Sequence, residues 1–170
     1  GSVQEFVVKP IPAIEGRDFE ETFAFHKELN DLSRDMSSAG RSLVEASNRL
    51  RHIEAALVQT STLAPELFEQ LAVLEQKQSE LSTQLYGDRI RRSKDISVEP
   101  AIAGRLNQVL YGLSETSLPP TQTHRTNVTL ARQGFDQFKV SLQDFWSELE
   151  KYETQVQQAG APYTPGRKLR

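Results

Sequence analysis

The three histidines are the first residues to consider, because a chain without cysteine can build a transition-metal site only from His, Asp and Glu. His26 and His52 fall in one predicted helix, about 39 Å apart along its axis. His124 lies in another segment, and neither His-x-x-x-His nor Glu-x-x-His occurs, so the ligand pairs of di-iron bundles are missing. We interpret the histidines as ordinary surface or boundary residues and predict no metal and no cofactor.

Paired carboxylates are the second candidate for chemistry. Glu20 and Glu21, and likewise Glu148 and Glu150, are predicted on the solvent faces of helices. Acid–base catalysis needs a carboxylate in a desolvated cleft, which such faces do not offer. The chain also lacks a phosphate loop, a Gly-x-Ser-x-Gly elbow and a Gly-x-Gly-x-x-Gly turn. The sequence therefore predicts no catalytic, cofactor-binding or metal-ligating residues, and this chain is not expected to be an enzyme.

A basic cluster between residues 88 and 97 is the only local concentration of charge. It contains Arg89, Arg91, Arg92 and Lys94, without an aromatic residue that could stack on bases. We interpret it as a solvated loop, with a partner or anion site as the alternative. The net charge of −3 gives no attraction to nucleic acid or anionic lipid, and no apolar run approaches the ~18 residues of a membrane helix. We predict no nucleic-acid partner and no membrane insertion.

The stretch from Thr22 to Thr60 is the element around which the rest must be organised. Apolar residues recur there at alternating steps of three and four, which predicts one helix with a heptad seam. No proline interrupts it, Gly40 is its only glycine, and the helix would be roughly 60 Å long. Its seam needs partner helices. The seam consists of Phe25, Leu29, Leu32, Met36, Ala39, Leu43, Ala46, Leu50, Ile53 and Leu57.

Three further stretches have helical periodicity, so four helices are predicted near residues 18–60, 65–86, 98–114 and 122–159. The last is a second long helix with an uninterrupted seam, and Trp146 flanks it. Gly104 and Gly112 weaken the third helix but would allow close approach of a neighbour. The second seam consists of Val128, Ala131, Phe135, Phe138, Leu142, Phe145, Leu149, Tyr152 and Val156.

Local signals mark the predicted helix ends. Asp18 is an expected N-cap with Glu21 at capping-box spacing, and Thr121 or Thr123 is expected to cap the last helix. Gly87 suits the position just after the second helix, and Gly160 with Pro162 should end the fourth.

The predicted fold class is all-α, an antiparallel up-down bundle of four helices in the order long, short, short, long. In this arrangement the two long helices are antiparallel, so that Phe23 and Phe25 approach Trp146, Leu149 and Tyr152 at a thin end that large rings would cover. The alternative is a three-helix bundle in which the two short helices point the same way and form one broken middle rod. The long helices are then parallel.

The chain divides into an extended, strand-like segment at 1–16, a helical bundle at 17–160 and a flexible basic tail at 161–170. Val3 to Lys9 alternates in the manner of a strand and is ended by proline. This segment is interpreted either as an extended arm lying on the bundle or as the last strand of a preceding β domain that was removed. The opening Gly1-Ser2 resembles a cloning scar, which suggests that a leader or a whole upstream domain was cut away. The absence of cysteine excludes disulfides without fixing the compartment.

Three segments together resemble a known arrangement: VQEFVVKPIPAI, SVEPAIAGRLNQVLYGLSETSLPPTQTH and QQAGAPYTPGR. They are similar to the C-terminal helical region of large bacterial proteins with BNR/Asp-box repeats, which are frequent in Bacteroidetes and often labelled sortilin-like, VPS10-like or glycosyl hydrolases. The resemblance covers nearly the whole chain. It implies an upstream β-propeller and β-sandwich, which would hold any hydrolase activity. No Asp box occurs here, so no functional residue is carried over.

From these observations we expect a non-catalytic accessory module of a larger exported protein, periplasmic or extracellular by resemblance. It would act as a spacer, a packing platform for the upstream β domains or a protein–protein contact, with a second copy or a partner helix as further candidates. The alternative is an independent coiled-coil adaptor that binds a partner helix.

Overall fold

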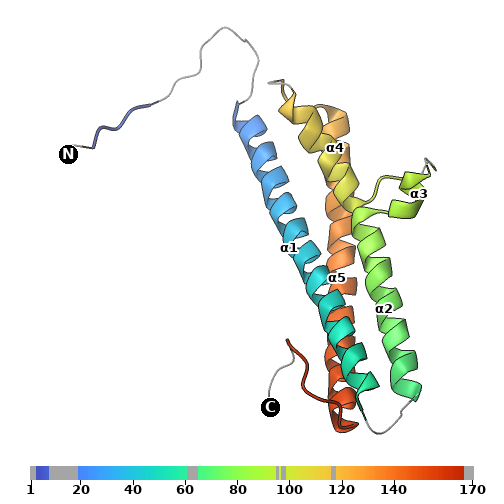
Figure 1. Ribbon diagram of the computed structural model, residues 1–170. Coiled ribbons are helices and arrows are strands. Elements are labelled where there is room, and N and C mark those ends of the chain that lie inside the picture. Colours follow the sequence, from blue (N-terminus) through green and yellow to red (C-terminus); the bar gives the residue numbers. More distant parts are fainter. Residues whose placement is uncertain are drawn as a thin grey trace.

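The computed structural model describes residues 3–7, 19–60, 65–94, 96, 99–115 and 118–166. The described part of the chain is helical apart from its connections and ends, and it forms a bundle (Figure 1). The prediction of an all-α bundle is therefore confirmed. The helices are α1 (Phe19–Val58), α2 (Pro65–Tyr86), α3 (Arg89–Ser93), α4 (Ile102–Ser114) and α5 (Gln122–Gln158).

Both long seams form the core as predicted. All ten seam residues of α1 and all nine of α5 are buried, with Ala46, Phe138 and Leu149 fully enclosed. The seam of α2 is buried at every position except Gln78, whose side-chain amide donates a hydrogen bond to the carbonyl oxygen of Leu43. Periodicity alone therefore identified the inward face of these helices.

The two long helices run parallel, so the predicted antiparallel pairing of these helices is wrong. Four side-chain pairs link α1 to α5, and in each pair the partners are 104 residues apart. A constant separation requires that both chains advance in the same direction, whereas antiparallel helices would give a constant sum. The four pairs are Glu21–Arg125, Glu28–Arg132, Ser42–Trp146 and Arg49–Glu153.

The aromatic residues follow the same parallel register. Phe25 lies beneath the guanidinium of Arg125, 5.4 Å from its ring centroid, at the start of both long helices. Trp146 and Tyr152 lie toward the other end, where α2 supplies the third wall of the core. Because α2 covers the seams of both long helices at that end, they do not form a two-helix end that large rings would have to cover. The positions of the aromatic residues therefore did not indicate the direction of the long helices.

The short helices α2 and α4 form the broken middle rod of the alternative architecture. Lys77 of α2 pairs with Glu148 of α5, and the Tyr152 hydroxyl donates to the carbonyl oxygen of Leu67, so α2 is antiparallel to α5. Helix α4 is also antiparallel to α5, because Ile102 at its start contacts Gly134, whereas Gly112 near its end contacts His124 in the first turn of α5. The chain descends in α1, ascends through α2 and then α4, and descends again in α5 (Figure 1).

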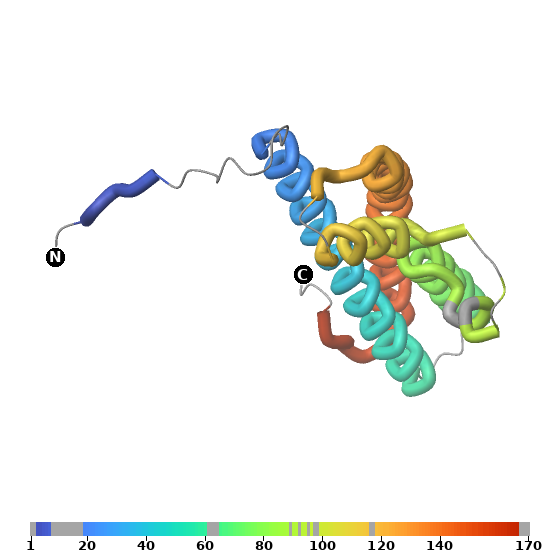
Figure 2. The backbone as a smooth tube through the Cα atoms, turned by 90° about the horizontal axis from the view of Figure 1, so that it is seen from above, coloured from blue at the N-terminus to red at the C-terminus, as the bar shows by residue number. Residues whose placement is uncertain are grey.

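The segment predicted as a loop between α2 and α4 contains the short helix α3. The Asp88 carboxylate accepts hydrogen bonds from the backbone amides of Ile90 and Arg91, which caps the helix. Helices α2 and α4 point the same way, and α3 lies between them in the chain. Seen from above, α3 stands out on the side of the bundle away from α1 (Figure 2).

The predicted cap at Thr121 is confirmed. Thr121 Oγ1 accepts from the backbone amide of His124, while His124 Nδ1 accepts from the amide of Thr121, so a histidine takes the place of the usual glutamate in the capping box. Gly87 and Gly160 have positive φ angles of 85° and 82°, as expected just after a helix. The predicted cap at Asp18 lies outside the described residues.

The two predicted close approaches at glycine in α4 differ. A Cβ on Gly112 would lie 3.0 Å from Nε2 of His124, so this glycine does admit a neighbouring side chain. A Cβ on Gly104 would meet only Pro100, at an ordinary 3.8 Å. Gly104 is therefore not required by packing.

The two ends of the chain differ in how they meet the bundle. Residues 3–7 form neither helix nor strand, and Val3, Phe6 and Val7 are largely exposed. By contrast, Ala161 and Thr164 are buried, and Gly166 lies against the side chain of Arg49. The first part of the predicted flexible tail thus packs on the bundle, whereas residues 167–170 lie outside the described part.

Two alanine substitutions of glycine are expected to have opposite signs. Gly160→Ala should destabilise the protein by about 1 kcal/mol, because alanine is unfavourable at a positive φ angle. A Cβ at this position would meet no atom within 4 Å, so no new contact offsets this cost. Gly104→Ala should stabilise it by up to about 1 kcal/mol, because helix propensity rises without a clash. Urea unfolding monitored by circular dichroism measures both. A loss at Gly104 would contradict the packing described above.

Candidate functional site

The three histidines do not converge. His26 and His52 lie on α1, and His124 is engaged in the capping box of α5. Among the described residues, no group of three or more His, Asp or Glu side chains is placed to hold a metal ion. None of the helices in this part of the chain is long and apolar enough to cross a membrane. The histidines therefore do not form a site in the described part of the chain.

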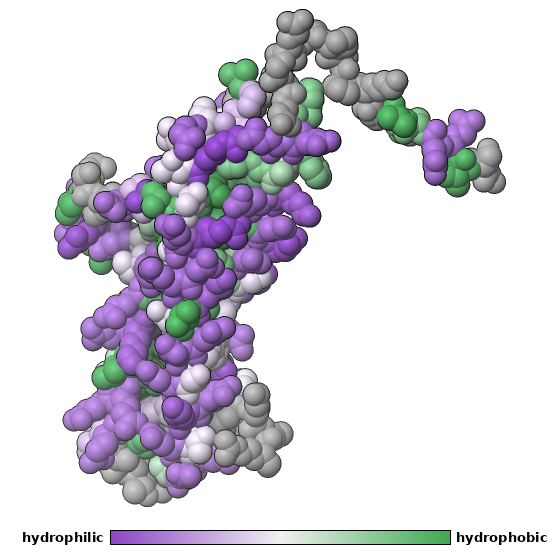
Figure 3. All heavy atoms as spheres, turned by 180° about the vertical axis from the view of Figure 1, so that it is seen from behind, coloured by the Kyte–Doolittle hydropathy of each residue, from purple (hydrophilic) through white to green (hydrophobic). Residues whose placement is uncertain are grey.

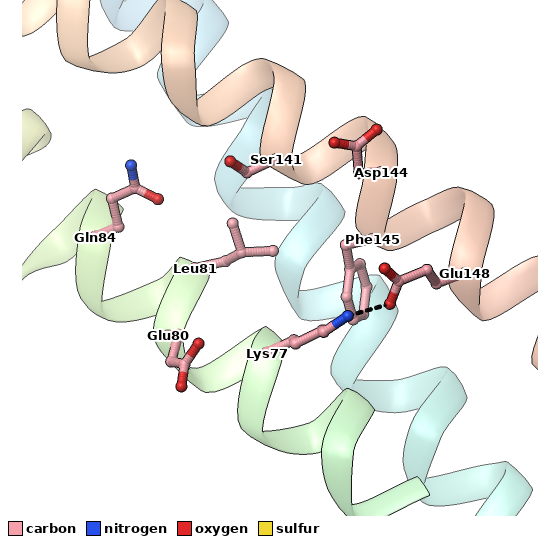
Figure 4. Close-up of a pocket in the computed structure, with 8 residues that line it drawn as sticks. All are labelled: Lys77, Glu80, Leu81, Gln84, Ser141, Asp144, Phe145 and Glu148. Atoms are coloured by element: carbon pink, nitrogen blue, oxygen red, sulfur yellow. Dashed lines mark hydrogen bonds and ion pairs between the residues drawn. The ribbon is translucent and has the colours of Figure 1, made fainter. Parts of the chain in front are cut away.

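A groove between α2 and α5 forms a concave surface on the described part of the chain. One hollow of about 300 Å³ lies midway along it, where Leu81 and Phe145 face each other (Figure 4). Lys77 Nζ reaches across from α2 to Glu148 Oε2 at 2.5 Å and closes one end of this hollow. A second hollow of about 420 Å³ continues toward the start of α2, and Glu148 lines both.

The apolar side chains at the floor of the groove are buried within the bundle. Leu74, Leu81, Phe145 and Tyr152 are all at most 7 % exposed. Val73 on the rim is 53 % exposed and is the main apolar group that an incoming molecule would touch. The groove is therefore shallow, and its chemistry is set by the polar side chains along its rims.

The rims of the groove are predominantly acidic. Five carboxylates line the two hollows against only two lysines, Lys77 and Lys151, which leaves a formal charge of −3. Lys77 is committed to Glu148. No cationic side chain in the described part of the chain pairs with Glu66, Glu69 or Asp144. The five carboxylates are Glu66, Glu69, Glu80, Asp144 and Glu148.

Tyr152 is the one buried titratable group in the groove, and it is not available for proton transfer near neutral pH. Its hydroxyl donates to the carbonyl oxygen of Leu67 at 2.7 Å. Burial and, secondarily, the charge of Glu75 raise the pKa of Tyr152 well above its usual value. The phenol remains protonated and anchors α5 to the first turn of α2.

A buried polar cluster joins the lower halves of α1 and α5. The Arg49 guanidinium donates to both carboxylate oxygens of Glu153, at 2.9 and 2.5 Å, and lies over the ring of Trp146, 4.9 Å from its centroid. Trp146 Nε1 in turn donates to Ser42 Oγ at 2.8 Å. Each member has a partner from the other helix. The cluster therefore fixes the parallel register and leaves no group free for catalysis.

Sequence reasoning did not identify this cluster, although Trp146 was noted beside the seam. Arg49 and Glu153 occupy the heptad positions that flank the core, where charged residues are normally exposed. The signal that could have found them is the repeated separation of 104 residues between complementary charges on the two seams. That signal is meaningful only once the helices are known to be parallel.

The basic cluster lies at α3, and Arg91 and Lys94, the two of its cations whose side chains are described, are exposed. Arg91 is 3.6 Å from the Asp88 carboxylate and its side chain is 62 % exposed. Ile90 and Ile96 are 68 % and 49 % exposed, so the segment combines positive charge with apolar side chains. This combination was not recognised from the sequence, where the segment was interpreted by charge alone.

No family model, curated protein or solved structure matches this chain.

Proposed function

We propose that the chain is a non-catalytic helical module of a larger exported protein, in which it acts as a spacer and packing platform for upstream β domains. The sequence resemblance to BNR-repeat proteins motivates this proposal. The observation that carries it is apolar surface at the end of the bundle where α1 begins (Figure 1). By the same resemblance the parent protein is periplasmic or extracellular.

That end of the bundle is formed by the start of α1 and the turn between α4 and α5, which the ion pair of Glu21 with Arg125 brings together. Phe19 and Phe23 are 48 % and 71 % exposed in the first turns of α1, and Leu118 before α5 is 63 % exposed. In the space-filling view, hydrophobic atoms gather in this upper part, while the rest of that face is mostly hydrophilic (Figure 3).

Exposed aromatic side chains at one end favour a contact with another folded unit. Contiguous apolar surface on a soluble protein usually marks an interaction site. Phe23 does not serve the core of this bundle, whereas Phe25, two residues later, is buried. A β domain that packs on this end would cover Phe19 and Phe23 and would hold the long helices at a fixed angle to it.

Hydrogen exchange tests the platform role. We expect the backbone amides of the first turns of α1 to exchange at least about tenfold more slowly in the full-length parent chain than in this 170-residue chain, because the contact suppresses local opening. Phe23→Ser should remove most of that difference. Val44→Ser, at an exposed site of α1 far from this end, is the matched control and should leave it unchanged.

A gene that encodes no β domain before this segment would overturn the proposal. Equal protection of the first turns of α1 in the parent chain and in the isolated chain would do the same.

An adaptor that binds a partner helix is the second candidate, with the groove between α2 and α5 as its docking site. A helix that docks in a groove normally inserts apolar anchors. The floor here is nearly inaccessible, with Leu74 and Leu81 at 5 % and 7 % exposure, so apolar anchors would gain little. We therefore place the adaptor role second.

A further inference from the structure

Residues 3–7 form a short extended segment whose apolar side chains are almost fully exposed. Val3 is 92 % exposed, and Phe6 and Val7 are each 84 % exposed. The backbone of these residues runs nearly straight, without a helical turn (Figure 2). These three side chains therefore do not contribute to the core of the bundle, and their apolar area is available to another folded unit.

The sequence from residue 3 to residue 9 has the composition and alternation of a β-strand. Valine and phenylalanine favour strands, and in a strand the side chains of successive residues point to opposite faces. Phe6 and Val8 share one face, whereas Glu5 and Lys9 share the other. A strand with this pattern covers an apolar core with the first face and leaves the charged face toward solvent.

The backbone of such a strand also needs a partner. A strand is stable only when its amide and carbonyl groups pair with a neighbouring strand. The described part of the chain contains helices and no strand, so it offers these residues no pairing partner. A helix cannot supply one along its length, because its amides and carbonyls are bonded within the helix. The fitting partner is therefore the edge of a β-sheet in another folded unit.

We infer that residues 3–9 add as a strand to the edge of a β-sheet in the upstream domain, with Phe6 and Val8 facing the core of that domain. This inference rests on the proposed function, which requires the β domain, and it specifies how the helical module is joined to it. Strand addition provides main-chain hydrogen bonds as well as side-chain contacts. The pairing should end by residue 9, because Pro10 has no amide hydrogen to donate.

Residue-resolved hydrogen exchange in the full-length parent chain and in the 170-residue chain tests this inference. In the 170-residue chain we expect the amides of residues 3–9 to exchange as in an unstructured peptide. In the parent chain, either the amides of residues 4, 6 and 8 or those of residues 5, 7 and 9 should exchange at least about a hundredfold more slowly, because alternate amides of an edge strand point to its neighbour. Slowing of less than about tenfold in both sets would overturn the inference.

The same measurement separates this inference from the platform role. Protection of the first turns of α1 in the parent chain, with fast exchange throughout residues 3–9, would overturn strand addition and leave the platform role standing. Protection of residues 3–9 without protection of α1 would do the reverse. Protection of residues 3–9 in the 170-residue chain that increases with its concentration would show that a second copy supplies the pairing strand, and would overturn the inference.

Two matched substitutions in the parent chain test which face points inward. Phe6→Ser should return the slowed amides to within about tenfold of their rates in the 170-residue chain, because it removes the largest side chain of the inward face. Val7→Ser removes an equally exposed apolar side chain from the opposite face and should leave the slowing in place. Circular dichroism verifies that both variants are folded. An equal effect of the two substitutions, or a larger effect of Val7→Ser, would overturn the inference.

Discussion

Glu153→Ala is expected to destabilise the protein by about 3–5 kcal/mol, because it leaves the Arg49 guanidinium buried without a counter-charge. The side chains of Arg49 and Glu153 are only 12 % and 7 % exposed, so water cannot replace the lost carboxylate without a rearrangement of α1 and α5. Urea unfolding monitored by circular dichroism measures the loss. Trp146 fluorescence should change in the same variant, because Arg49 lies over its ring.

The chain provides a matched control for this prediction. Glu28 and Arg132 form an ion pair at the same two heptad positions, also 104 residues apart, but their side chains are 44 % and 43 % exposed. Glu28→Ala should therefore cost less than about 1 kcal/mol. Replacing both Arg49 and Glu153 by leucine should cost less than Glu153→Ala alone, since no buried charge is then left unpaired. Equal losses at Glu28 and Glu153 would show that burial does not determine the effect.

The sequence predicted the helices and their inward faces well because heptad periodicity is a local property. Apolar spacing depends only on the 3.6-residue turn, and the ends are marked by single residues such as Thr121 and Gly160. The ends of α1 and α5 consequently fall within two residues of their predicted positions. None of these signals depends on which helices are neighbours.

The direction of the long helices was not predictable from the seams, because an apolar seam is nearly symmetric under reversal. Direction is specified by the residues that flank it, here Glu28 with Arg132 and Arg49 with Glu153. A comparison of these flanking charges under both directions would have favoured the parallel arrangement. The clustering of large rings gave a misleading answer, because it assumed a two-helix end that α2 in fact covers.

The acidic groove could not be predicted for the same reason. Glu66 and Asp144 are ordinary exposed carboxylates when each helix is considered alone. They line one groove only because α2 runs antiparallel to the second half of α5. A groove lined by residues of two helices depends on which helices are neighbours and on their directions. Because the predicted direction of the long helices was wrong, this groove was not predicted.

Phe138→Ala is expected to destabilise the protein by about 3–5 kcal/mol, the usual cost of removing a buried ring. Phe138 is completely buried and stacks on Phe135, with 5.9 Å between the ring centroids. It follows Gly134, which contacts Ile102 at the start of α4, by one helical turn. The ring therefore lies near the junction where α2 ends and α4 begins. Because the backbone is interrupted at this junction, we expect it to relax little around the cavity that the missing ring leaves.

Four further substitutions separate this effect from a general loss of side-chain volume. Val140→Ala, on the exposed face of the same helix, should cost less than about 0.5 kcal/mol, and so should Ser93→Ala in α3. Phe138→Leu should lie between these values and the alanine variant, because it retains part of the ring's volume. Leu43 lies against α2 where that helix is continuous. Leu43→Ala should therefore cost about 2–5 kcal/mol, and less than Phe138→Ala. A larger loss at Leu43 than at Phe138 would mean that the junction is not the point at which the bundle depends most on side-chain volume.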